Sequence, residues 1–304
     1  MSTKKFKFSC ITSMFIFLVL GFVCSSVSAY KLLMGEDSAV RWTGGDEVEY
    51  YINPSGCPSG SLSAIKAAMK TWSNVSTSSF EFVYAGTTES KAYGEDDGFN
   101  IVCFGSISTK GAVGENQLWY DDMDNAILDS DIILSTKYKW STNGSGDSHD
   151  VQSVATHELG HSLHLGDLYG SDDTEKTMYA HGAAKIGQRT LHRDDIDGIT
   201  YLYPSDHISH TGEISVSVYD INGSPITYES LRLKGKKTKT SIITSTDGDG
   251  FFKFEWLRAD TYIITVSDKD DRGFYSNCCY QNVKRKVILG EGGEGEISVT
   301  MEEK

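Results

Sequence analysis

The residues best suited to chemistry lie in one short segment, residues 155–167, which reads Ala-Thr-His-Glu-Leu-Gly-His-Ser-Leu-His-Leu-Gly-Asp. His157 and His161 are four residues apart, so on a helix their imidazoles lie one turn apart on the same face and can bind one metal ion. Glu158 lies beside that ion without having to bind it. Its carboxylate can take a proton from a metal-activated water and later deliver it to a leaving amine. The spacing therefore predicts a hydrolytic zinc site.

A catalytic zinc ion needs a third protein ligand and keeps a fourth position open. Asp167 is the best placed residue if the helix ends near His164 and the chain then reverses. The Cα atom of His164 would lie about 10.5 Å along a straight helix from that of His157, which is too far for one ion to bind both easily. His181 is a third, more distant candidate. We expect Asp167 to be the ligand and keep the two histidines as alternatives.

The N-terminus has the features of an export signal. Three lysines within the first seven residues precede an apolar run over residues 11–23, and small residues follow at 27–29. This order predicts a signal peptide over residues 1–29 and a mature chain that begins at Tyr30. An uncleaved membrane anchor is the alternative, although the apolar run is short for a membrane span. We expect a secreted protein without a membrane span after signal removal.

The net charge excludes several classes of partner. The formal charge is −14, and the first 29 residues contribute three lysines and no acids, so the mature chain carries −14 − 3 = −17. Such a chain repels nucleic acid and anionic membranes. We therefore expect no nucleic acid partner.

The cysteines of the mature chain are even in number, which makes disulfides plausible in an exported protein. Cys57 and Cys103 form the natural pair in the first half of the chain. The adjacent Cys278 and Cys279 predict either a strained vicinal bridge or two packed thiols. No cysteines have C-x-x-C spacing, so a cysteine zinc site is not expected.

Hydrophobic periodicity divides the chain into two units. Residues 30–204 read as a mixture of helices and strands, and residues 212–304 read as short alternating strands with Gly-containing turns. A polar linker is predicted over 205–211. Helices are predicted over 61–72, 147–161 and 194–203, and strands over 47–52, 80–84, 99–104, 129–134, 214–218, 251–254 and 262–266. Ser61 or Ser63 is the expected N-cap of the first helix.

The segment 157–167 resembles the metzincin zinc motif, H-E-x-x-H-x-x-G-x-x-H, and in particular that of the matrixins. Two positions differ from the motif. His164 replaces the glycine at which the helix normally breaks, so His164 is expected to adopt a left-handed conformation at some cost. Asp167 replaces the third histidine, and some metzincin-like proteases use aspartate at that position. The resemblance implies that His157, His161 and Asp167 are the zinc ligands.

The resemblance extends along the first unit to residue 204. Lys176-Thr177-Met178-Tyr179 is similar to the Met-turn, which implies that Met178 lies beneath the zinc ligands as structural support and that Tyr179 lines the substrate pocket. Residues 189–199 are similar to the start of the last matrixin helix, in which an acidic residue often pairs with the mature N-terminus. Asp194 or Asp195 would have that role here.

Two features of the family are missing from the sequence. No cysteine precedes the first unit in a pro-segment, so latency through a thiolate that blocks the zinc is not expected. No histidine cluster for a second, structural zinc is present. An acidic stretch offers oxygen ligands for Ca²⁺, with a solvated acidic loop as the alternative. Its members are Asp121, Asp122, Asp124, Asp129 and Asp131.

Together these observations predict an α+β fold. A zincin or metzincin catalytic domain, with a twisted mixed sheet and three helices, would precede a small all-β sandwich that resembles carboxypeptidase-regulatory-like or prealbumin-like modules. The expected function is a secreted, monomeric zinc endopeptidase that acts on protein or peptide substrates, with Zn²⁺ as the catalytic metal. The alternative is a secreted adhesion or binding protein with an inactive zinc site. The intact Glu158 favours the enzyme, since a structural zinc site has no use for a base.

Overall fold

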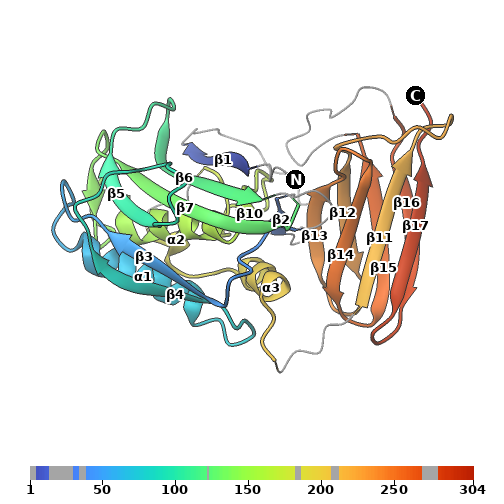
Figure 1. Ribbon diagram of the computed structural model, residues 1–304, viewed down its shortest axis with the longest axis horizontal. Helices are drawn as coiled ribbons and strands as arrows, with labels where there is room; N and C mark the ends of the chain where they lie inside the picture. Colours follow the sequence, from blue (N-terminus) through green and yellow to red (C-terminus); the bar gives the residue numbers. More distant parts are fainter. Residues whose placement is uncertain are drawn as a thin grey trace.

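The computed structural model describes residues 5–13, 30–33, 39–121, 123–181, 186–206, 212–268 and 280–304. Several predictions lie wholly or partly outside these residues: most of the apolar run 11–23, the cleavage positions 27–29, Asp122 of the acidic stretch, most of the linker 205–211, and the pair Cys278 and Cys279. The described chain has an α/β part, up to residue 206, and an all-β part from Gly212 onward, which we call the C-terminal β-unit (Figure 1).

The α/β part is built on a six-stranded mixed sheet with the order β1-β6-β7-β5-β3-β4. Strands β4, β3, β5 and β7 run parallel, whereas β6 is antiparallel to β7 and β1 is antiparallel to β6. The strands span β1 (Lys5–Ser13), β3 (Glu47–Ile52), β4 (Glu81–Thr87), β5 (Ile101–Gly105), β6 (Ala112–Asp121) and β7 (Ala126–Ser135).

The prediction missed β6, and the reason is physical. Gly114, Glu115, Asn116 and Gln117 form a polar run in the sequence, yet the first three are buried, and Gly114 and Asn116 lie on the side of β6 that faces a helix. Asn116 satisfies its amide there, because Nδ2 donates to Ser130 Oγ at 3.0 Å and to Ser162 Oγ at 2.8 Å. Buried polar side chains with partners of this kind leave no hydrophobic pattern to recognise.

Three helices accompany the sheet: α1 (Ser61–Ser73), α2 (Val151–Ser162) and α3 (Arg193–Leu202). The apolar residues of α1 are buried at helical spacing, and Trp72 Nε1 donates to the Thr156 carbonyl of α2 at 2.8 Å. The predicted serine N-cap of α1 is wrong, because α1 already begins at Ser61 and left-handed Gly60 (φ 87°) precedes it. Helix α2 is capped by Asp150, whose side chain accepts from Ser153 N at 3.0 Å.

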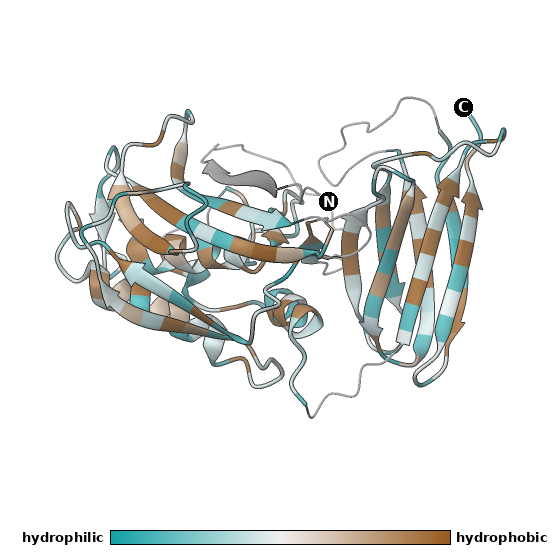
Figure 2. Cartoon of the chain, in the orientation of Figure 1, coloured by the Kyte–Doolittle hydropathy of each residue, from teal (hydrophilic) through white to brown (hydrophobic). Residues whose placement is uncertain are grey.

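The C-terminal β-unit contains the three-stranded sheet β14-β11-β17 and most of a six-stranded sheet, β10-β2-β13-β12-β15-β16. Burial alternates along β11 and β15, as period-2 strands require, and Figure 2 shows the same alternation in hydropathy. The strands span β11 (Gly212–Tyr219), β12 (Ser230–Gly235), β13 (Ser241–Ser245), β14 (Phe251–Leu257), β15 (Asp260–Ser267), β16 (Val283–Leu289) and β17 (Glu294–Thr300).

Short elements complete the chain, and two of them belong to both parts. These elements are β2 (Tyr30–Leu32), β8 (Trp140–Ser141), β9 (His149–Asp150), β10 (Leu165–Gly166) and the 3₁₀ helix η1 (Gly187–Arg189). Strand β10 directly follows α2 in the α/β part, and β2 joins it to the sheet of the C-terminal β-unit. None of the helices in the described ranges is long and apolar enough to cross a membrane.

The predicted disulfide between Cys57 and Cys103 is wrong, because both residues are free thiols. Cys57 lies in the turn before α1, where Sγ donates to the Asn53 carbonyl at 3.3 Å. Cys103 is buried in β5 in a separate apolar cluster with Ile101 and Ile133. Burial raises the pKa of both thiols, to about 11 for Cys57 and to about 12 for Cys103.

Candidate metal centre

Helix α2 and the turn after it bring three potential ligands to one point. The Nε2 atoms of His157 and His161 are 3.0 Å apart, and Asp167 Oδ1 lies 3.3 Å and 3.5 Å from them. Zinc–ligand bonds of about 2.0–2.2 Å at tetrahedral angles separate neighbouring ligand atoms by about 3.3–3.6 Å. Asp167 Oδ1 is buried and makes no hydrogen bond, so it is available to a cation. The donor set therefore fits zinc in both chemistry and spacing.

The opposite edges of both imidazoles are held by backbone carbonyls. His157 Nδ1 donates to the Thr177 carbonyl and His161 Nδ1 to the Leu165 carbonyl, each at 2.7 Å. These bonds place the proton on Nδ1 and direct the Nε2 lone pairs toward the common point. Tyr169 was missed by the sequence analysis, and its hydroxyl donates to Asp167 Oδ2 at 3.2 Å.

Electrostatics within the cluster favour positive charge. Burial by itself raises the pKa of the Asp167 carboxyl, but the imidazoles of His161 and His157 outweigh this effect and hold the pKa below its usual range. Burial lowers the pKa of His157, and the Asp167 carboxylate outweighs that effect and raises it to about 9. A buried carboxylate that stays ionised between two imidazoles is an environment suited to a divalent cation.

The chain reverses at His164, as predicted from the sequence. Helix α2 ends at Ser162, and His164 has φ 67°, in the left-handed region. This reversal directs the His164 ring away from the ligands and against Tyr120, with ring centroids 5.3 Å apart. Burial, and then the nearby His161, lower the pKa of His164 to about 3, so this imidazole is neutral.

The alternative ligands are therefore not part of the cluster. Among the described residues, His157, His161 and Asp167 form the one group of three or more side chains that could hold a metal ion. The His181 ring instead lies near Tyr169 and Tyr179, with centroids 5.8 Å and 5.4 Å away. The acidic stretch proposed for calcium gives no such group within the described chain.

Two of those acids organise a loop instead. Asp131 accepts hydrogen bonds from Gly94 N at 2.6 Å and Ile101 N at 3.0 Å, and Asp129 accepts from Phe99 N at 3.0 Å. Burial raises the pKa of Asp129 to about 6 and that of Asp131 to about 7. Both carboxyls thus hold the connection between β4 and β5, which no local sequence pattern indicated.

Glu158 is completely buried and directs its carboxylate toward β6. At Gly114, an added Cβ would lie 2.4 Å from Glu158 Oε1 and 2.9 Å from a Val154 methyl. The missing side chain at this position of β6 is therefore what leaves room for the Glu158 carboxylate. The sequence contained no signal for this role, because the two residues meet only when β6 lies beside α2.

If the chain hydrolyses peptides with Glu158 as the base, as the sequence predicts, Gly114→Ala should lower that rate by about 100-fold, since the new methyl group must displace the Glu158 carboxylate by an ångström or more. Zinc content should stay at the wild-type level. Gly44→Ala is the matched control, because a Cβ there meets nothing within 4 Å. Full activity of the Gly114→Ala protein would show that the position of Glu158 does not depend on this glycine.

The segment similar to a Met-turn lies directly under α2. Met178 is 2% exposed, and a Cβ on Gly160 of α2 would lie 2.2 Å from Met178 Sδ. Asp195 holds this turn, since its carboxylate accepts from Thr177 N at 3.0 Å and from Met178 N at 3.3 Å. Tyr179 is partly exposed beside the turn.

The two acids considered for the mature N-terminus have other partners. Asp195 is occupied by the backbone of the turn. Asp194 pairs with the buried ammonium of Lys176, with Nζ–Oδ2 at 2.8 Å, and Lys176 also contacts Asp173 at 2.7 Å. An internal lysine therefore supplies the cation beside α3.

Comparison with known proteins agrees with this arrangement of residues. A family model described as matrixin matches residues 41–204, which is more than half of the chain. The chain therefore belongs to the matrixin family, and this membership supports a metalloprotease type of activity.

Solved structures match a smaller part of the chain. The group B streptococcus pilus 2b backbone protein is 17% identical over 30% of this chain and 41% of its own, with a TM-score of 0.24. The major pilin subunit BcpA of Bacillus cereus is 16% identical over 31% of this chain and 30% of its own (TM-score 0.26). The Klebsiella pneumoniae 5-hydroxyisourate hydrolase is 16% identical over 31% and 91% (TM-score 0.25). The chain thus spans less than half the length of either pilus protein, and these scores are too low to support any conclusion about function.

Proposed function

We propose that this chain is a secreted zinc-dependent endopeptidase. The observation that supports the proposal most directly is the convergence of His157, His161 and Asp167 beside the buried Glu158. Three protein ligands leave a position open for water or substrate, which is typical of a catalytic rather than a structural zinc site.

In this proposal each residue has a defined task. His157, His161 and Asp167 hold the metal, and the carbonyls of Thr177 and Leu165 orient the imidazoles. Bound zinc supplies a Lewis acid that polarises the scissile carbonyl and makes water a stronger nucleophile at neutral pH. Glu158 accepts the proton of the attacking water and passes it to the leaving amine.

The substrate is proposed to lie along the outer edge of β6. Strand β1 supports this, because residues 5–13 pair antiparallel with β6 from Asp121 to Ala112. Strand β6 also carries Gly114, which lies beside the Glu158 carboxylate. An extended peptide that replaces β1 after removal of residues 1–29 would thus form main-chain hydrogen bonds beside the general base. Tyr179 is proposed to line the substrate pocket, and Met178 is proposed to support the ligands from below.

The test uses purified residues 30–304. We expect one tightly held zinc ion per chain and cleavage of a generic unfolded protein that stops with a chelator and returns with zinc. Zinc bound without any cleavage would contradict the endopeptidase and favour a non-catalytic zinc site. Cleavage that persists in excess chelator would contradict the metal mechanism.

A further inference from the structure

The segment that connects the second and third ligands is paired with the first strand of the mature chain. Strand β10 (Leu165–Gly166) lies between His161 and Asp167, and it pairs antiparallel with β2 through Leu165–Leu32 and Gly166–Lys31. The next residue extends this contact, because Leu33 N donates to the His164 carbonyl at 3.2 Å. Every residue from His164 to Gly166 is therefore opposite a residue of the 31–33 segment.

This pairing bears directly on the ligand geometry. The Leu165 carbonyl accepts the hydrogen bond from His161 Nδ1, and Gly166 is bonded to Asp167. A displacement of β10 would therefore rotate the His161 imidazole and shift Asp167. A strand of two residues has little stability alone, so its position depends on the strand beside it.

Close packing reinforces the backbone contact. A Cβ on Gly166 would lie 3.1 Å from the side chains of both Lys31 and Leu33. Tyr30 is 3% exposed and packs on α3, where a Cβ on Gly198 would lie 3.3 Å from its Cβ and Cγ. Leu32 is 2% exposed. The N-terminal strand is thus an integral part of the structure around the ligand loop.

The other edge of β2 belongs to the C-terminal β-unit. Strand β13 pairs with β2 in parallel, through Ile242–Tyr30 and Ile243–Lys31. One sheet therefore runs without interruption from the ligand loop, through β2, into β13, β12, β15 and β16. Figure 1 shows β10, β2 and β13 side by side where the two parts meet.

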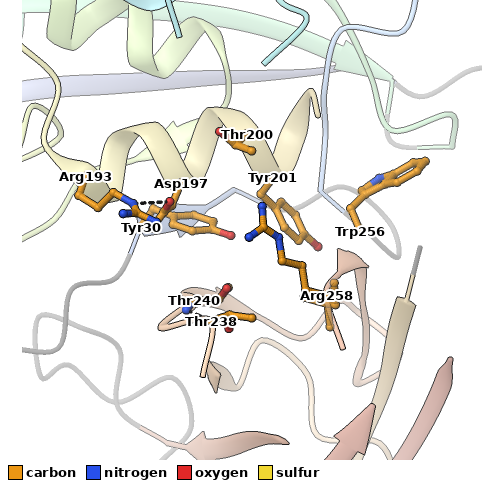
Figure 3. Close-up of a pocket in the computed structure, with 10 residues that line it drawn as sticks. Tyr30, Arg193, Asp197, Thr200, Tyr201, Thr238, Thr240, Trp256 and Arg258 are labelled. Carbon is orange, nitrogen blue, oxygen red and sulfur yellow. Dashed lines mark hydrogen bonds and ion pairs between the residues drawn. The ribbon is translucent and has the colours of Figure 1, made fainter. Parts of the chain in front are cut away.

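Side-chain contacts among the described residues also join the two parts. Tyr201 of α3 accepts a hydrogen bond from Glu255 N at 2.8 Å, and Arg41 lies over the Trp256 ring at 5.4 Å. Next to β2, residues of both parts line a small pocket, among them Tyr30 and Tyr201 from the α/β part and Thr238, Trp256 and Arg258 from the β-unit (Figure 3). Strand β2 connects β10 in the ligand loop to β13 of the β-unit by backbone pairing within one sheet.

We propose that residues 30–33 position the zinc-ligand loop and that the C-terminal β-unit holds them in place through β13. The inference rests on the proposed zinc site and adds a role for the β-unit: it stabilises the metal centre in addition to any binding function. Loss of either edge of β2 should loosen Asp167 and accelerate zinc release. Outer contacts of this kind change metal affinity by about 10–100-fold.

Two proline variants of the full mature chain test the two edges of β2 separately. Successive N–H groups of a strand point to opposite sides. Leu33→Pro removes the hydrogen bond to the His164 carbonyl, and Leu32→Pro removes an N–H that points toward β13. Lys286→Pro is the matched control, because it introduces the same residue into β16, at the far edge of the same sheet. A chain of residues 34–304 lacks β2 altogether.

The measurements are the rate of zinc transfer to a chromophoric chelator and the thermal unfolding of each apo protein. We expect zinc release at least about tenfold faster for both β2 variants and for residues 34–304, with Lys286→Pro within twofold of wild type. Comparable losses of apo stability in Leu32→Pro and Lys286→Pro would show that zinc release follows β2 and not general destabilisation.

Several results would overturn the inference. Wild-type zinc release in both β2 variants would remove the role of β2, and faster release in Leu33→Pro alone would remove the role of the β-unit. If the chain of residues 34–304 fails to fold, Leu33→Pro and Leu32→Pro still test the roles of β2 and of the β-unit. A wild-type chain that binds no zinc would instead contradict the proposed function, so the two failures are distinguishable.

Discussion

Replacing Glu158 with glutamine is expected to lower kcat/KM for peptide hydrolysis by about 10²–10⁴-fold while zinc stays bound. Glutamine has nearly the same size, so it fits the space that Gly114 leaves beside the Glu158 carboxylate. It cannot accept the proton of the attacking water. The three ligand side chains are untouched, so the metal content should not change.

The measurement is cleavage of an unfolded protein by the purified Glu158→Gln chain, with zinc content determined on the same sample. Glu229→Gln is a suitable control, because it neutralises another completely buried glutamate, which lies in the C-terminal β-unit far along the chain from the metal centre. Its activity should match the wild type within a few fold. Undiminished cleavage by pure Glu158→Gln protein would assign the general base to another group.

Replacing Asp167 with alanine is expected to weaken zinc binding by more than about 100-fold and to abolish cleavage. Loss of a direct ligand should exceed the 10–100-fold effects that follow from loss of outer contacts. Two buried imidazoles would remain, with their Nε2 atoms 3.0 Å apart and no carboxylate to offset the metal charge. The measurement is zinc affinity by competition with a chelator of known strength.

His164→Gly and His181→Ala are the paired tests of the alternative ligands. Both proteins should hold zinc within a few fold of wild type, since neither ring belongs to the ligand cluster. Glycine also suits the φ of 67° at position 164 better than histidine does. Zinc loss in His164→Gly or His181→Ala, with retention in Asp167→Ala, would transfer the third ligand to the histidine concerned.

Predictions from the sequence were most successful where the structure depends on neighbours along the chain. The three helices and the strand 47–52 follow from local periodicity, and the structure has them within a few residues. The relative positions of His157, Glu158 and His161 follow from helical geometry alone. The left-handed conformation of His164 was expected from the resemblance to the metzincin motif, in which a glycine at this position breaks the helix.

Tertiary structure decided what depends on residues that are distant in sequence. The polar segment Gly114–Gln117 of β6 gave no hydrophobic pattern, and Gly114 leaves room for the Glu158 carboxylate only because β6 lies beside α2 in the folded chain. A disulfide between Cys57 and Cys103 was plausible because the cysteines are even in number, yet both thiols are free. Tyr169 contacts Asp167 through a loop whose course no periodic pattern encodes.

The sequence by itself thus predicted the helix that carries His157, Glu158 and His161 and the relative positions of these side chains, because a helix places residues four apart on one face in any context. The convergence of Asp167, and not His164, on the two imidazoles was decided by the tertiary structure, as were the space beside Glu158 and the strand that connects β10 to the C-terminal β-unit. They depend on backbone pairing and steric contact between segments such as Tyr30–Leu32, Leu165–Gly166 and Ser241–Ser245. Such contacts form only when the whole chain has folded.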